Sequence, residues 1–64
     1  MPIISIDGPT IQDINKRREF VAKVTAAASE VYSMPKEKII ILIRENSPEQ
    51  VAVGGELISD RTQG

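Results

Sequence analysis

The second residue of this 64-residue chain is a proline, and the chain contains neither histidine nor cysteine. If Met1 is removed, which is usual before a small residue, the ring nitrogen of Pro2 becomes a free secondary amine. An α-amino group titrates near pH ~8, far closer to neutrality than a lysine side chain. Burial or a nearby cation lowers the pKa of such an amine further, so it can act as a general base at neutral pH. Pro2 is therefore the best candidate for proton transfer, although Met-Pro also opens many chains without this chemistry.

Composition limits the other kinds of site and the kinds of partner. Without cysteine or histidine the chain lacks the ligands of nearly every structural zinc site, and it cannot form a disulfide. Eight Lys and Arg stand against nine Asp and Glu, so no overall field attracts nucleic acid or an anionic membrane. No apolar run approaches the ~18 residues of a spanning helix, and the N-terminus has no secretory pattern. We expect a cytoplasmic protein that binds neither nucleic acid nor membrane.

The length predicts a single small domain over residues 1–64 that needs help to be stable. A chain of this size buries only about 60% of its unfolded surface and is marginal as a monomer. Disulfides, a metal or oligomerisation are the usual remedies. Because composition removes the first two, oligomerisation is the expected one.

The first half of the chain predicts a strand followed by a long helix. Residues 2–7 form a short isoleucine-rich stretch that ends at the turn signal Gly8-Pro9. Asp13 is a suitable N-cap for a helix that begins at Ile14, and Pro35 ends that helix because the residue before proline avoids helical angles. The expected buried face carries Phe20, Val24, Ala27, Ala28 and Val31, with Val21 beside them.

The second half predicts a second strand and a hairpin. Residues 39–43 are five consecutive aliphatic residues and four are β-branched, which favours a strand. Residues 51–58 suggest short β structure bent at Gly54-Gly55. Strand, helix and strand make a βαβ unit whose long crossover permits a parallel two-stranded sheet with a right-handed connection. The fold class is therefore α/β, one βαβ unit with a short C-terminal β-hairpin.

The second strand is apolar on both of its faces. Ile39, Ile41 and Ile43 share one face, whereas Ile40, Leu42 and Arg44 share the other. One helix covers only one face of a sheet, and strands that are apolar on both faces belong to sheets covered on both sides. We expect the second face to meet another copy of the chain, because monomers rarely expose a large apolar patch.

These features together resemble the 4-oxalocrotonate tautomerase family. The resemblance covers essentially the whole chain and rests on an N-terminal Pro2, a βαβ unit of matching length, Pro35 after the helix, an aliphatic second strand and residues 53–57 (Val-Gly-Gly-Glu-Leu). It implies a cofactor-free enol–keto tautomerase that uses Pro2 as general base and acid on a small 2-oxo or dienol acid, similar to 2-hydroxymuconate (4-oxalocrotonate) tautomerase. It also implies a homohexamer built as a trimer of dimers, with active sites shared between subunits.

The chain departs from the family pattern at three positions in the implied site. The family's two arginines align with Gln12 and Ile40, and the aromatic residue of the pocket wall aligns with Val51. The proline base therefore carries over, whereas the usual arginine contacts to a small anionic enol or keto acid do not. Ile40 and Val51 become expected pocket-wall residues, and Gln12 can offer a neutral hydrogen bond to a substrate oxygen or simply be solvated.

Two cations are candidates to replace the missing arginines. Arg44 follows Ile40 on the same strand face and can bind an anionic substrate, or it can be a solvated arginine at a strand end. Lys16 lies in the first helical turn, where the helix dipole mildly disfavours a cation, and it can serve a pocket mouth or be ordinary helix surface.

Two other classes of protein compete with the tautomerase interpretation. The first is a non-catalytic oligomer that keeps the fold for ligand binding or structure, and the missing arginines favour it. The second is a ribbon–helix–helix DNA-binding protein, whose strand reads bases with polar or basic side chains. Residues 2–7 contain no lysine or arginine, and the aliphatic run 39–43 stands where a second helix is required. We therefore reject the DNA-binding class.

Overall fold

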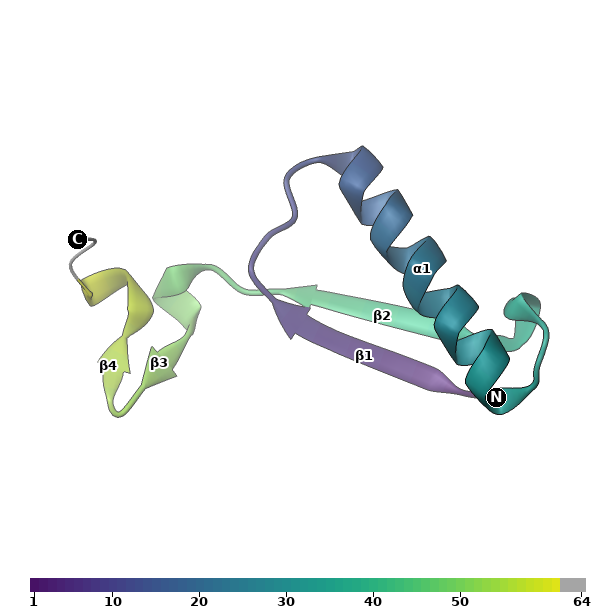
Figure 1. Ribbon diagram of the computed structural model, residues 1–64. Helices are drawn as coiled ribbons and strands as arrows, with labels where there is room; N and C mark the ends of the chain where they lie inside the picture. The colour runs from purple at the N-terminus through teal and green to yellow at the C-terminus, as the bar shows by residue number, and fades with distance from the viewer. Residues whose placement is uncertain (62–64) are drawn as a thin grey trace.

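The computed structural model describes residues 1–61 and contains a βαβ unit followed by a hairpin. Figure 1 shows the strands β1 and β2 side by side, with α1 across one face and the hairpin projecting from the far end of the sheet. The elements, in chain order, are β1 (Ile3–Gly8), α1 (Ile14–Tyr32), β2 (Ile40–Glu45), β3 (Ala52–Val53) and β4 (Glu56–Leu57), with short 3₁₀ turns at Lys36–Lys38, Pro48–Gln50 and Ile58–Asp60. The predicted α/β class, one βαβ unit with a C-terminal hairpin, is confirmed.

Both ends of α1 lie where local sequence signals place them. The Asp13 carboxylate accepts a hydrogen bond from the backbone N–H of Asn15 at 2.8 Å, as an N-cap does. At the other end Ser33 adopts the left-handed conformation (φ 54°), and the Met34 N–H donates to the Ser29 carbonyl at 3.1 Å. This arrangement satisfies the last free carbonyls, and Pro35 then prevents the helix from continuing.

The sheet is parallel and pairs residue 3 with residue 40 through to residue 8 with residue 45. The predicted second strand starts one residue too early and ends too soon. The 3₁₀ turn before it holds the Ile39 N–H on the Lys36 carbonyl, so pairing begins at Ile40, whose N–H donates to the Pro2 carbonyl at 3.0 Å. Pairing extends to Glu45 because β1 continues to Gly8.

The helix packs on the sheet with only part of the predicted face: Val21, Val24 and Ala28 lie on it, whereas Phe20, Ala27 and Val31 are exposed. Ala28 is buried (7% exposed), and Val21, Val24 and Thr25 around it are half-buried, while Phe20 and Val31 are 37% and 78% exposed. The inward face carries small and β-branched side chains, which let the helix backbone approach the sheet closely. The larger residues Phe20 and Val31, which the apolar stripe had placed in the core, lie outside it.

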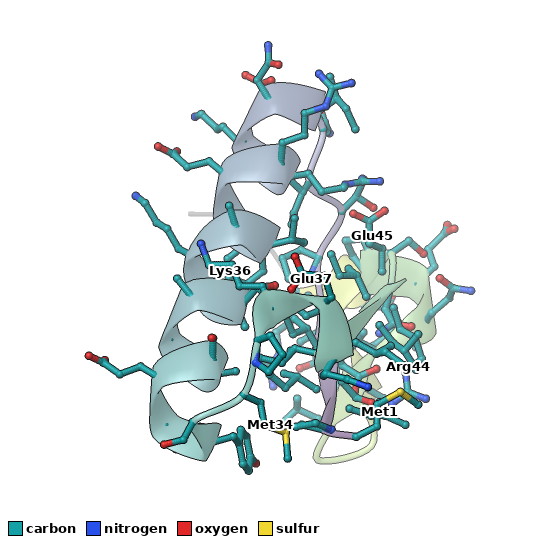
Figure 2. The ribbon with its side chains drawn as sticks, turned by 90° about the vertical axis from the view of Figure 1, so that its right-hand side faces the viewer. Met1, Met34, Lys36, Glu37, Arg44 and Glu45 are labelled. Carbon is teal, nitrogen blue, oxygen red and sulfur yellow. The ribbon has the colours of Figure 1, made fainter. Side chains whose placement is uncertain are left out.

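One face of the sheet is open, as its two-sided apolar pattern predicts. Ile4, Ile6, Ile41 and Ile43 are half-buried on the side of α1. The opposite face carries the register partners Ile3 with Ile40, Ser5 with Leu42 and Asp7 with Arg44, and Ile3 and Leu42 are 57% and 51% exposed. Figure 2, which looks along the strands, shows Met1 and Arg44 on this side, away from α1.

The C-terminal hairpin extends away from the βαβ unit. Gly54 (φ 63°) and Gly55 (φ 83°) form its two-residue loop, and positive φ at both positions is what a type I′ turn requires. The radius of gyration is 15.3 Å, whereas a compact chain of this length has about 11 Å. The hairpin with its exposed Val53 and Leu57 is therefore an arm, and it contributes little to the core of its own chain.

Candidate functional site

Pro2 lies at the N-terminal end of the sheet, next to the start of β2. Its ring is half-buried, and its carbonyl accepts the Ile40 N–H, so Pro2 and Ile40 are direct neighbours. Met1 before it is 77% exposed, and with Met1 in place the Pro2 nitrogen is an amide. The structure therefore brings together two of the predicted site residues, the proline and the apolar residue that aligns with a family arginine.

The other predicted site residues gather at the opposite end of the molecule. Val51 lines a cavity of about 360 Å³ beyond the carboxyl end of β1, together with Asp7, Gly8, Pro9, Asn46, Pro48 and Ile58. Gly8 is six residues after Pro2, so at ~3.3 Å per residue the cavity lies roughly 20 Å from Pro2 of the same chain. This cavity and the candidate base are thus at different ends of one subunit.

Arg44 lies at the cavity end of the sheet and is bound to a carboxylate. Its Nε and its Nη2 donate to the two oxygens of Asp7 at 2.8 and 3.2 Å, across the register pair of β1 and β2. The hydrogen bonds that Arg44 donates to Asp7, followed by the negative charge of Asp7, raise the pKa of Arg44 above its ordinary value. Four residues separate Arg44 from Ile40, so it lies about 13 Å further along the strand and does not reach Pro2 of its own chain.

Gln12 and Lys16 also lie toward the cavity end. Gln12 is exposed in the loop that follows β1, and Lys16 is exposed in the first turn of α1, which begins near that end of the sheet (Figure 1). Within one subunit neither residue is placed at the proline.

A network that joins loop, helix and sheet at this end was not foreseen. One terminal nitrogen (Nη2) of Arg17 donates to Glu45 Oε2 at 2.6 Å and to the Ile11 carbonyl at 2.7 Å, while the Ile11 N–H donates to the same Glu45 oxygen at 2.9 Å. Both charged side chains are only partly exposed, 35% and 24%. The sequence shows an arginine in the first helical turn and a glutamate at a strand end, but only the packing of α1 on β2 reveals that they meet.

We expect Glu45→Ala to destabilise the protein by about 1–3 kcal/mol, because it leaves the Ile11 N–H and the Arg17 guanidinium without their shared acceptor. Urea unfolding at one fixed protein concentration measures the change. Glu19→Ala is the matched control, since the Glu19–Lys23 pair (3.6 Å) is well exposed and worth at most about 0.5 kcal/mol. Equal effects of the two substitutions would contradict the role of the network.

No cluster of three or more metal-ligating side chains occurs within residues 1–61, which the structure describes. No helix in the same range is long and apolar enough to cross a bilayer.

Comparison with known proteins gives consistent matches along the chain. The family model described as "Tautomerase enzyme" matches residues 2–61. A probable tautomerase of Bacillus cereus is 34% identical over 61 residues, which are 95% of this chain and 100% of the relative. A 2-hydroxymuconate tautomerase of Bacillus subtilis is 32% identical over 60 residues, 94% of this chain and 97% of the relative. The crystal structure of DmpI from Archaeoglobus fulgidus has a TM-score of 0.83 and 46% identity, covering 92% of this chain and 100% of the other.

Proposed function

The chain belongs to the tautomerase family, and from this premise we propose that it is a cofactor-free enol–keto isomerase whose base is the nitrogen of Pro2 after removal of Met1. The observation that carries the proposal is the family match, which begins at Pro2 and covers nearly the whole chain. The proposed substrate is a small 2-oxo or dienol acid, similar in its reacting part to the substrate named for the 2-hydroxymuconate tautomerase relative.

The proposed reaction moves one proton and leaves the substrate's formula unchanged. The lone pair of the Pro2 nitrogen takes the proton of the enol hydroxyl, and the enol electrons shift to form the ketone. The protonated amine then returns the proton to the conjugated carbon. Acid–base positioning of this kind contributes about a hundred- to ten-thousand-fold in rate. An apolar surrounding such as that of Ile40 and Leu42 disfavours the charged amine and so favours the basic form.

The proposed active site forms between copies of the chain. Pro2 and Ile40 lie roughly 20 Å from the cavity that Val51 lines, so one subunit holds two separate halves of a site. A neighbour that brings its Pro2 to the cavity completes the site. The open sheet face and the projecting hairpin both expose apolar residues, and among residues 1–61 only Ala28 is a buried hydrophobic residue. These features support a homo-oligomer, and we propose the homohexamer, a cytoplasmic trimer of dimers.

A non-catalytic ligand-binding or structural oligomer is the second candidate. The observation that favours it is the replacement of the family's two arginines by Gln12 and Ile40, which removes the usual charge stabilisation of a dienolate. The candidate predicts that assembly and ligand binding persist without turnover of any enol.

Retention of Met1 tests the proposed base directly. Protein with Met1 retained is expected to be inactive in the ketonisation of simple enols, because its Pro2 nitrogen is an amide and has no basicity. Processed protein at the same concentration is the comparison, and intact mass spectrometry establishes which form is present. Equal rates for the two forms would refute the proline mechanism.

A further inference from the structure

We infer that the cavity at the carboxyl ends of β1 and β2 selects an acid with one carboxylate and an apolar body, and that it disfavours a dicarboxylate. The inference rests on the proposed function in one point: the ligand of this cavity is taken to be the substrate on which Pro2 of a neighbouring copy acts.

The cavity has the size and lining of a small-molecule site. Its volume of about 360 Å³ lies at the lower end of the 300–1,000 Å³ that such sites occupy. The walls contain Pro9, Pro48, Val51 and Ile58, and the polar lining residues are Asp7 and Asn46. Apolar walls bind the hydrocarbon or aryl part of a ligand, while a small number of polar groups fix its orientation.

The charge at the cavity wall is balanced. Asp7 lines the cavity, and its carboxylate is bound by both Nε and Nη2 of Arg44. A pair of opposite charges has no net attraction for an anion at a distance. A single substrate carboxylate can share the Arg44 guanidinium, whose remaining N–H groups are free to donate to a second acceptor. A second carboxylate on the same ligand meets the negative charge of Asp7 and the apolar walls.

Two further arginines at this end are also paired with carboxylates. Arg17 binds Glu45 at 2.6 Å, and Arg61, three residues after the lining residue Ile58, binds Glu56 at 3.2 Å. In the described part of the chain, Arg44, Arg17 and Arg61 therefore each carry their own counter-charge, whereas Arg18 on α1 donates to the side-chain oxygen of Asn15 at 3.1 Å. A dianion would have to displace one of these carboxylates, and an unpaired carboxylate in an apolar site is costly.

Binding of unreactive acids tests the inference separately from catalysis. In an NMR titration of the processed protein, 3-phenylpropionate (one carboxylate, aryl body) is expected to shift the amides of Gly8, Asn46 and Val51. Adipate (two carboxylates, a chain of similar length) is expected to bind at least about tenfold more weakly. Binding of adipate as tight as that of 3-phenylpropionate would overturn the inference, and so would shifts confined to other residues.

Two substitutions test the part played by the ion pair. Arg44→Ala is expected to weaken the binding of 3-phenylpropionate about tenfold, which is the effect of losing one charge-assisted hydrogen bond. Asp7→Asn keeps the side-chain shape and removes the carboxylate that pairs with Arg44. It is therefore expected to tighten the binding of both acids and to reduce the difference between their affinities. Glu19→Gln, which removes the partner of Lys23 on the outer side of the helix, is the control and should not change the affinity for either acid.

Catalysis by the same variants separates the assignment of the cavity from the proposed tautomerase activity. With the enol of phenylpyruvate as monocarboxylate substrate, Arg44→Ala should raise KM about tenfold and leave kcat within about twofold. Unchanged binding and KM in both Asp7→Asn and Arg44→Ala would end the cavity assignment even if Pro2-dependent turnover persists. Selective binding of 3-phenylpropionate without turnover of any enol would instead retain the assignment and reject the tautomerase.

Discussion

Pro2→Ala is expected to lower kcat for the ketonisation of a simple enol by at least about a hundredfold, at the lower end of the contribution of a positioned acid–base group. Alanine at this position still permits removal of Met1, so the variant keeps a terminal amine. It loses the pyrrolidine ring, which restrains the nitrogen, and the free primary amine must be frozen in place during proton transfer. Initial rates measured on the processed variant and the processed parent give the comparison.

The fold of the Pro2→Ala variant should be unaffected, so the fall in kcat can be attributed to the loss of the proline ring. The sheet contact of residue 2 is made by its backbone carbonyl, which alanine retains. Circular dichroism and sedimentation should therefore match those of the parent. On the acidic side of the parent's pH–rate profile, the rate should fall with the protonation of one amine. The pKa of that amine should be near or below the ordinary α-amino value of about 8. A variant with full activity and an unchanged pH profile would show that another group is the base.

Leu42→Asp is expected to leave a single chain in solution at micromolar concentration and to abolish turnover. Leu42 is 51% exposed in the centre of the open sheet face, between the neighbouring pairs Ile3–Ile40 and Asp7–Arg44. If this face meets another copy, the substitution buries an unpaired carboxylate, which costs several kcal/mol at each interface. Sedimentation equilibrium measures the mass, and activity should fall with it because each proposed site needs two copies.

Val31→Asp is the matched control for the sheet substitution. Val31 is 78% exposed at the end of α1, away from the open sheet face, so the same kind of change there should leave mass and activity unchanged. A Leu42→Asp protein that keeps the parent's mass would show that the open face is not the contact between copies. Loss of assembly in both variants would instead point to a general loss of the fold.

The local signals in the sequence predicted each element well because each depends on neighbours along the chain. Asp13 caps the helix by accepting a hydrogen bond from the N–H of Asn15, two residues further along the chain. Pro35 disfavours helical angles at Met34, and Gly54-Gly55 supplies the two positive φ angles of the hairpin loop. The apolar residues on both faces of the second strand likewise predicted a sheet face that α1 does not cover, and the fold contains one. The errors are the bounds of the second strand and the placing of Phe20, Ala27 and Val31 on the buried helix face. The late start of the strand comes from the local bond of the Ile39 N–H to the Lys36 carbonyl, whereas its later end and the helix face depend on contacts with distant residues.

The predicted site was only partly assembled by one subunit, and the reason is geometric. Parallel pairing of residue 3 with residue 40 sets Pro2 beside Ile40 and sends Arg44 and Val51 to the other end. The strand length then separates the groups by more than any side chain can span. Sequence alignment with a family identifies the residues of a site, but it does not say which of them one chain brings together.

For this protein, residue order alone determined a candidate base at Pro2, the βαβ-hairpin sequence of elements and a sheet too apolar to stand uncovered. Tertiary structure decided the strand register, the rotation of α1 that leaves Phe20 and Val31 outside the core, and the two ion pairs Asp7–Arg44 and Arg17–Glu45. Caps and turns are settled by interactions over a few residues. The two ion pairs join side chains 28 and 37 positions apart in the sequence, and contacts over such separations have no local signature.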